Sequence, residues 1–254
     1  TTEASRLVVS ATNLEVAISY SVGCKTEKEG SVTAPARLFA ELISSMPSDK
    51  IQLTSAGDNL SIKTTNFESS LNGIAVSEFP TTPQVKPEAE FTIPSPVLLE
   101  GLSEVVVAAS LDESRPVLAG VAMIVADGQL TLAATDSYRL AEKKLPLPSV
   151  KDITVIVPAK TVQELNRIIH DSSDDVRIAI SKTEVLFEVG DVSLVSRLIE
   201  GKFPNYQQII PTKSATSLTL KKSELMSIVK VASLFARENS HTIKLNFTKV
   251  GLSI

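Results

Sequence analysis

The chain has 254 residues, of which 43% are hydrophobic and 21% are charged, and its formal net charge is −4 at pH 7. This composition excludes disordered, collagen-like and membrane-spanning chains and allows one or two globular domains, of which two is the better expectation. The single cysteine, Cys24, excludes an intramolecular disulfide and a multi-cysteine zinc site. The lack of disulfides fits a protein of a reducing compartment. The cytoplasm is therefore the expected location. The only histidines are His170 and His241, so we expect a protein that is not an enzyme and binds no metal or cofactor.

The N-terminus has no basic segment followed by an apolar run, and no apolar stretch approaches the roughly 20 residues of a membrane span. We therefore expect a soluble protein. Because the chain begins with Thr1 instead of methionine and both ends fall within a repeat described below, we also expect it to be a fragment.

Four helices are predicted from apolar residues at helical spacing, three of them following a proline that suits a helix start. In the first, this spacing is formed by Leu38, Leu42, Ile43 and Met46 after Pro35. The four helices are expected at residues 35–46, 96–110, 158–170 and 221–237.

Short strands are predicted between the helices. Residues 51–53 and 176–180 alternate between apolar and polar types, as half-buried strands do. The pair Asp127-Gly128 separates two apolar segments and is typical of a two-residue hairpin turn. The sheets should therefore be antiparallel, and two helices packed on them give an α+β domain.

An internal repeat of about 123 residues organises the chain. A third copy begins near Ala232-Ser233-Leu234, which repeats Ala109-Ser110-Leu111. This period fits a tandem of whole domains instead of a solenoid. The domain boundaries expected from it are 1–90, 91–211 and 212–254. The matching blocks are Leu7–Asn13 with Leu130–Asp136, Ala34–Arg37 with Val157–Lys160, and Glu78–Pro80 with Lys202–Pro204.

The two larger copies share one turn and differ directly after it. Thr135 and Asp136 recur as Thr12 and Asn13, which indicates a structural turn in which short side chains bond to the backbone. One copy then reads Leu14-Glu15-Val16 and the other Ser137-Tyr138-Arg139-Leu140. An aromatic, a guanidinium and a leucine together are typical of a peptide-binding surface, although a solvated strand edge is the commoner reason for such a pattern.

Four blocks resemble the bacterial DNA polymerase III beta subunit, the sliding-clamp family. They are Arg115–Gly120, the sequence ATDSYRLA from Ala134, the sequence VPAK from Val157, and the sequence EGKFPNYQQIIP ending at Pro211. The resemblance covers the whole chain in order. It implies tandem repeats of the DNA clamp fold: the second half of a first domain, a complete middle domain and the first half of a third.

The resemblance implies a processivity factor without catalytic activity. Two subunits of this family close head to tail into a ring around duplex DNA and tether the replicative polymerase. The implied partners are double-stranded DNA, without sequence preference, and short peptides of the polymerase III alpha subunit, the clamp loader and repair proteins. A ring that slides must contact phosphates weakly and read no bases.

The resemblance also places a peptide-binding groove on the middle domain. This chain has Tyr138 where the family usually has histidine, Ser137 where it usually has glycine, and Gln208 where arginine is common. These departures bear on which peptides the groove prefers, not on whether the groove exists. The far wall of the groove belongs to the end of the third domain. The groove residues implied are Leu118, Thr135, Tyr138, Arg139, Leu140, Pro204, Gln208 and Ile209.

Basic residues near the helices are the expected DNA contacts. The four predicted helices contain seven basic and five acidic residues, whereas the rest of the chain contains 18 basic and 24 acidic ones, as expected of a positive bore in an acidic body. Helix 96–110 carries only acidic residues and departs from this pattern. The DNA-binding residues expected are Lys160, Arg37, Arg167, Arg115 and Lys222.

The subunit seam is expected near Leu71 and near Leu234 and Phe235, although the apolar alternation around Leu71 equally indicates a core position. The alternatives are weaker. A hydrolase using Ser137 and Asp136 lacks a nucleophile-elbow motif, and a phosphate-binding loop lacks its glycine cluster. A repeat-built structural or peptide-binding module that does not encircle DNA explains the repeat but not the Tyr138 segment.

Overall fold

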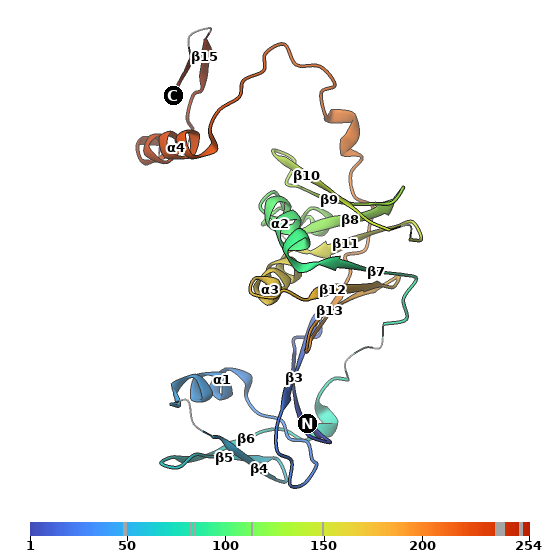
Figure 1. Cartoon of the computed structure of the whole chain (residues 1–254), viewed down its shortest axis with the longest axis vertical. Helices are drawn as coiled ribbons and strands as arrows, with labels where there is room; N and C mark the ends of the chain where they lie inside the picture. Colours follow the sequence, from blue (N-terminus) through green and yellow to red (C-terminus); the bar gives the residue numbers. More distant parts are fainter. Residues whose placement is uncertain are drawn as a thin grey trace. The chain divides into compact units, whose positions relative to one another are not determined.

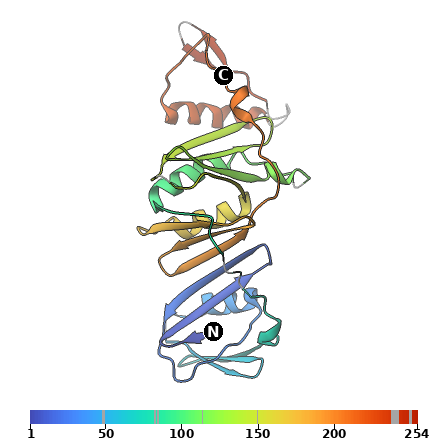
Figure 2. The same cartoon turned by 90° about the vertical axis from the view of Figure 1, so that its right-hand side faces the viewer.

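The computed structural model describes residues 1–47, 50–81, 83, 85–112, 114–148, 150–236, 242–248 and 251–254. The chain divides into two compact units, unit 1 (Thr1–Phe203) and unit 2 (Pro204–Ile254) (Figures 1 and 2). Arg237, at the end of the fourth predicted helix, and His241 lie outside the described residues.

The first part of unit 1 contains seven elements before the middle repeat. They are the strands β1 (Thr2–Glu3), β2 (Arg6–Thr12) and β3 (Val16–Gly23), the helix α1 (Ala36–Ser45), and the strands β4 (Gln52–Ala56), β5 (Asn59–Lys63) and β6 (Glu68–Asn72). A 3-10 turn, η1 (Val76–Glu78), follows them.

The middle repeat has two long helices and eight strands. They are β7 (Ala89–Pro94), α2 (Ser95–Val106), β8 (Gly120–Ala126), β9 (Gln129–Thr135), β10 (Leu140–Pro146), β11 (Ile153–Pro158), α3 (Ala159–Ile169), β12 (Asp175–Ile180), β13 (Glu184–Val189) and β14 (Val192–Arg197). A short 3-10 turn, η2 (Pro116–Leu118), precedes β8.

Unit 2 is smaller. It contains the 3-10 turn η3 (Tyr206–Ile209), the helix α4 (Lys222–Ala236) and the hairpin strands β15 (Asn246–Thr248) and β16 (Gly251–Ser253). Within the part of the chain that the structure describes, no helix is long and apolar enough to cross a membrane, and no group of three metal-ligating side chains is present.

The strand pairs of both units are antiparallel, as the alternating segments predicted. One sheet of unit 1 has the order β1-β2-β3-β14-β13-β12-β7, and a second has the order β10-β9-β8-β11. The pairing of β3 with β14 joins the first part of unit 1 to the middle repeat, with Tyr20 opposite Val192. Arg6 also forms an ion pair with Asp191 across this junction.

The helices confirm the predicted positions, with two corrections. Helix α2 ends at Val106, four residues before the predicted end. The predicted apolar face of α1 was wrong at Leu38, which is 51% exposed. Phe39, Leu42 and Ile43 pack instead against the small core of β5 and β6. The predicted positions Leu42, Ile43 and Met46 are confirmed, and Phe39 takes the place predicted for Leu38, because residue 39 lies three and four positions before 42 and 43.

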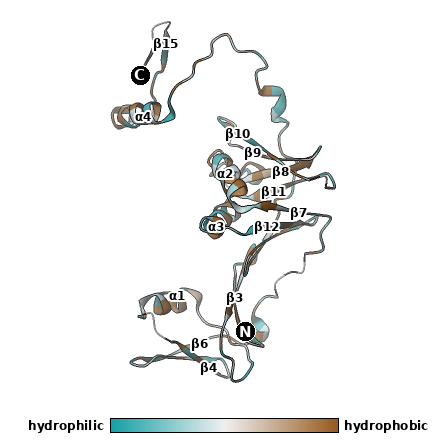
Figure 3. Cartoon of the chain, in the orientation of Figure 1, coloured by the Kyte–Doolittle hydropathy of each residue, from teal (hydrophilic) through white to brown (hydrophobic). Residues whose placement is uncertain are grey.

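The main core lies in the middle repeat, where α2 and α3 lie side by side against the strands (Figure 1). Leu98 and Leu102 of α2 and Leu165 of α3 are 0–1% exposed, in agreement with the predicted spacing. The strands that meet these helices are strongly hydrophobic (Figure 3). A core of this kind is stabilised mainly by removal of apolar surface from water.

The repeat is confirmed element by element. A shift of 123 residues places β2 on β9, α1 on α3 and β4 on β12, each within a residue or two at both ends. The same shift places β6 close to β14. The two copies therefore fold by the same local rules.

The hairpin prediction at Asp127-Gly128 is also confirmed. These two residues join β8 to β9 and both have positive φ, 51° and 70°. This is the backbone geometry that a two-residue turn needs to match the twist of its strands.

Candidate functional site

The turn after β9 is held by side chains that bond to its own backbone. The Thr135 hydroxyl donates to the carbonyl of Arg139 at 2.7 Å and accepts the N–H of Ser137 at 3.1 Å. Asp136 Oδ1 accepts the N–H groups of Tyr138 at 2.9 Å and Arg139 at 3.0 Å. The predicted structural role of Thr135 and Asp136 is therefore confirmed.

The first repeat builds the same turn from Thr12 and Asn13. The Thr12 hydroxyl donates to the Val16 carbonyl at 2.9 Å and accepts the Leu14 N–H at 3.0 Å, and Asn13 Oδ1 accepts the N–H groups of Glu15 and Val16. This bond pattern matches that of the later turn atom for atom. The third turn residue has positive φ in both copies, 74° at Leu14 and 81° at Ser137.

We expect Leu14→Gly to stabilise the protein. A non-glycine residue at positive φ costs roughly 1–2 kcal/mol, partly offset by the greater freedom of glycine in the unfolded chain. Leu14 is 66% exposed, so little packing is lost. A rise in the free energy of unfolding of up to about 1 kcal/mol should appear in urea titrations. A loss of stability would show that the Leu14 side chain contributes more than its backbone strain costs.

The turn of the middle repeat presents its side chains to solvent. Tyr138 is 94% exposed, and Leu140, the first residue of β10, is half-buried. Arg139 Nε lies 3.0 Å from Asp136 Oδ2. Hydrogen bonds from the N–H groups of Arg139 and Tyr138 hold the pKa of Asp136 below its ordinary value of 3.8, so this carboxylate is ionised at neutral pH.

Arg115 contacts this turn from a separate loop, which also contains Leu118. Leu118 ends η2 and is buried, with 9% of its surface exposed. Arg115 pairs with Asp112 at 3.1 Å, and its Nη1 donates to the Ser137 hydroxyl at 3.3 Å. The structure thus brings Arg115 to the Thr135–Leu140 turn within unit 1. A contact of Leu118 with this turn stays a prediction.

The remaining predicted groove residues belong to unit 2. Pro204 and Gln208 are exposed, and Ile209 is 71% exposed on η3. Between Pro204 and Gln208, Tyr206 is buried, with 4% of its surface exposed. The prediction that both segments form one groove stays a prediction.

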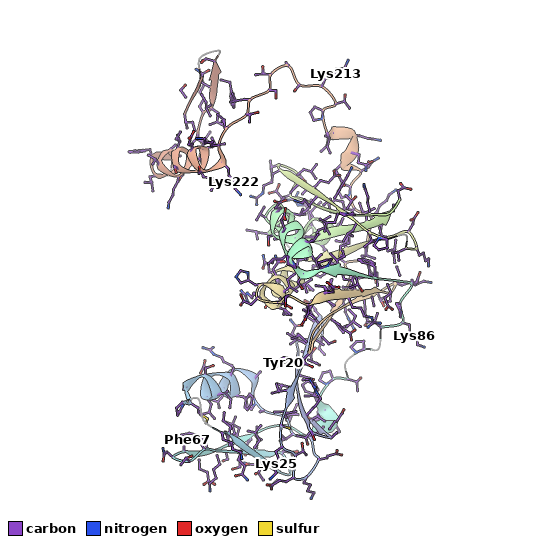
Figure 4. All side chains as sticks on the ribbon, viewed as in Figure 1. Tyr20, Lys25, Phe67, Lys86, Lys213 and Lys222 are labelled. Carbon is purple, nitrogen blue, oxygen red and sulfur yellow. The ribbon has the colours of Figure 1, made fainter. Side chains whose placement is uncertain are left out.

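The predicted DNA contacts are exposed basic residues near the starts and ends of helices. Arg37 in α1 pairs with Glu41, and Arg167 in α3 pairs with Glu164, each at 2.9 Å. Lys160 lies in the first turn of α3 and is exposed. Lys222 begins α4 (Figure 4). Exposed pairs of this kind contribute little stability, so these side chains can exchange partners.

The acidic residues of α2 have a partner that the sequence did not reveal. Lys143 Nζ on β10 lies 2.7 Å from a carboxylate oxygen of Glu100 and 2.9 Å from one of Glu104. The hydrogen bond to Glu100, followed by the one to Glu104, raises the pKa of Lys143 above its ordinary value of 10.5. The unfavourable charge of α2 is therefore partly balanced within the repeat.

The two predicted parts of the subunit seam differ in exposure. Leu71 is buried in the small core with Leu60 and Ile62, which is the core position that its alternation also indicated. Leu234 and Phe235 on α4 are 55% and 77% exposed. A role of these residues in subunit contact stays a prediction.

Comparison with known proteins gives the family. Two family models match: the central domain of the DNA polymerase III beta subunit over residues 92–205, and its N-terminal domain over residues 1–83. The repeated turn and the layered α+β repeats are thus those of a DNA clamp. The chain belongs to the DNA polymerase III beta-subunit family.

Relatives and solved structures agree with this assignment. The beta sliding clamp of Bacillus subtilis is 33% identical over 220 residues, which are 85% of this chain and 58% of that protein. A Pseudomonas aeruginosa sliding clamp bound to griselimycin matches with TM-score 0.91 and 26% identity, over 97% of this chain and 68% of that one. A Bacillus subtilis clamp structure matches with TM-score 0.86 and 27% identity, over 99% and 72%. The predicted clamp fold is therefore confirmed, and the chain spans slightly more than half the length of the curated relatives.

Proposed function

We propose that the protein to which this chain belongs is a sliding clamp: a head-to-tail ring of two subunits that encircles duplex DNA and tethers the replicative polymerase. The observation that carries this proposal is the ordered match of two consecutive clamp domains, reinforced by the turn that both repeats build with the same bonds. The enclosure itself supplies the tether, so no base readout and no catalytic group is required. The protein acts in the cytoplasm, where the chromosome is replicated.

Basic side chains on the helices support the DNA role. Arg37, Lys160 and Arg167 all lie on helices of unit 1, exposed to solvent. These helices lie on one side of the strands (Figure 1). Long, mobile cations can contact successive phosphates without fixing the position of the ring, because each exposed contact is weak and salt-dependent.

The exposed turn supports the partner role. Tyr138 and Arg139 stand out from a rigid turn, and tyrosine and arginine are enriched among the residues that dominate binding energy at interfaces. We assign to this surface the binding of short peptides from the polymerase III alpha subunit, the clamp loader and repair proteins. The family resemblance adds Leu118, Leu140, Pro204, Gln208 and Ile209 to the proposed binding residues.

We propose griselimycin as a probe of the partner surface. Two clamps of known structure bind it, those of Pseudomonas aeruginosa and Bartonella birtlesii. In the family, the far wall of the groove lies in a part of the third domain beyond the region that matches this chain. We therefore expect the 254-residue chain to bind griselimycin with Kd weaker than micromolar, with amide shifts in NMR spectra near Tyr138. Micromolar binding would contradict the need for the far wall.

A matched pair of variants separates the surface from the rest of the repeat. Tyr138→Ala should weaken griselimycin binding several-fold, because it removes a large, rigid contact. Leu111→Ala removes a side chain that is 93% exposed and lies outside the predicted groove, and should leave binding unchanged. Equal losses of griselimycin binding in both variants would contradict a binding groove at Tyr138.

A further inference from the structure

The loop that precedes β8 is closed at its base. The N–H of Ser110 donates to the carbonyl of Leu118 at 2.8 Å, and the N–H of Asp112 donates to the Ser110 hydroxyl at 3.1 Å. Ser110 and Leu118 are both buried, with 7% and 9% of their surface exposed. The described part of this loop is therefore anchored to the core at both ends.

Arg115 is fixed within this loop by its backbone and its side chain. Its carbonyl accepts the N–H of Leu118 at 3.0 Å. Its Nε donates to Asp112 Oδ2 at 3.1 Å, and its Nη1 donates to the Ser137 hydroxyl at 3.3 Å. A planar guanidinium can make both bonds at once, because its donors form a rigid fork. Arg115 thus joins the loop to a turn 22 residues further along the chain.

Ser137 is the strained residue of that turn. Its φ of 81° places it in a region that favours glycine, and its hydroxyl is the group that Arg115 binds. The equivalent residue of the first repeat, Leu14, has the same strained backbone but no hydroxyl. The two turns thus share the hydrogen bonds to their own backbone. The later turn adds the contact of Arg115 with Ser137 and the pair of Arg139 with Asp136.

We propose that Arg115 is a positioning residue for the partner-binding turn, acting through the Ser137 hydroxyl. By holding Ser137, Arg115 restricts the backbone of the adjacent Tyr138 before any partner arrives. Preorganisation of this kind lowers the ordering cost of binding. The inference rests on the proposed function of the turn. It also changes the expected role of Arg115, whose guanidinium serves the turn and not DNA.

Hydrogen exchange of backbone amides tests the positioning role without a ligand. In the 254-residue chain, Arg115→Ala should speed exchange of the Tyr138 and Arg139 amides by roughly 2- to 10-fold, the range expected for loss of one exposed hydrogen bond. The amides of Glu15 and Val16 occupy the equivalent turn and provide an internal control that should not change. Equal acceleration in both turns, or none in either, would overturn the proposal.

Arg115→Lys separates charge from geometry. A lysine keeps the positive charge but cannot form the fork that joins Asp112 and Ser137. We expect it to exchange as fast as the alanine variant at Tyr138. Full protection in the lysine variant would overturn the proposal. So would a loss of duplex-DNA affinity in Arg115→Ala that is as large as that in Arg37→Ala.

A double-mutant cycle shows whether the contact acts on partner binding. Arg115→Ala and Ser137→Ala should each weaken griselimycin binding about 2- to 10-fold, and the double variant should bind no more weakly than the weaker-binding of the two single variants. Fully additive losses would contradict action through Ser137. If the unaltered chain gave no griselimycin binding at millimolar concentrations, the proposed groove would fail, while the exchange experiment would still decide whether Arg115 holds the turn.

Discussion

Leu165→Ala should lower the free energy of unfolding of unit 1 by about 2–5 kcal/mol. Leu165 is fully buried on α3 and packs in the main core, so its truncation removes apolar contacts and leaves a cavity that the surrounding strands cannot fill without moving. Thermal and urea unfolding followed by circular dichroism would measure the loss.

Arg167→Ala is the matched control on the same helix. Its side chain is 76% exposed and forms an exposed ion pair with Glu164, so the free energy of unfolding should change by less than about 0.5 kcal/mol. A loss below 1 kcal/mol for Leu165→Ala would contradict the described core.

Replacement of Arg37, Lys160 and Arg167 together by alanine should weaken duplex-DNA binding by roughly tenfold or more at low salt. Each residue that contacts a phosphate contributes about one to the slope of log K against log salt, so the slope should fall by about three. Because all three side chains are exposed, the fold should persist. Fluorescence anisotropy of a labelled duplex between about 50 and 200 mM salt measures both quantities.

The control for this variant removes the same charge from the strands and loops. Lys63, Lys151 and Lys182 are exposed and none lies on a helix. Their joint replacement by alanine should change DNA affinity and salt slope much less. Equal losses of DNA affinity in the two triple variants would show that DNA binding depends on net charge alone. That result would contradict the proposal that these helices line the DNA-binding bore.

The repeat and its helices could be predicted because they depend on local sequence patterns that occur twice in the chain. Two copies of the Thr-Asn or Thr-Asp turn, 123 residues apart, form the same bonds around Leu14 and Ser137. The hairpin at Asp127-Gly128 similarly follows from the two residues that occupy it.

Contacts between distant segments could not be predicted. The apolar face of α1 depends on which residues meet the small core. The helical spacing predicted Leu38 on this face, whereas Phe39 packs there and Leu38 is exposed. The contact of Arg115 with Ser137 and that of Lys143 with the acidic residues of α2 depend on tertiary structure, and no sequence spacing indicates them. The comparison of the two repeats located the turn and indicated its side-chain bonds to the backbone, whereas its link to Arg115 required coordinates.

Native mass spectrometry of the gene product, purified from its own cells, tests most directly whether the protein forms a closed ring. We expect a subunit of about three repeats, roughly 370 residues, assembled as a dimer. A subunit that remains monomeric at micromolar concentration, with no dimer peak, would contradict the ring and the tethering mechanism that depends on it.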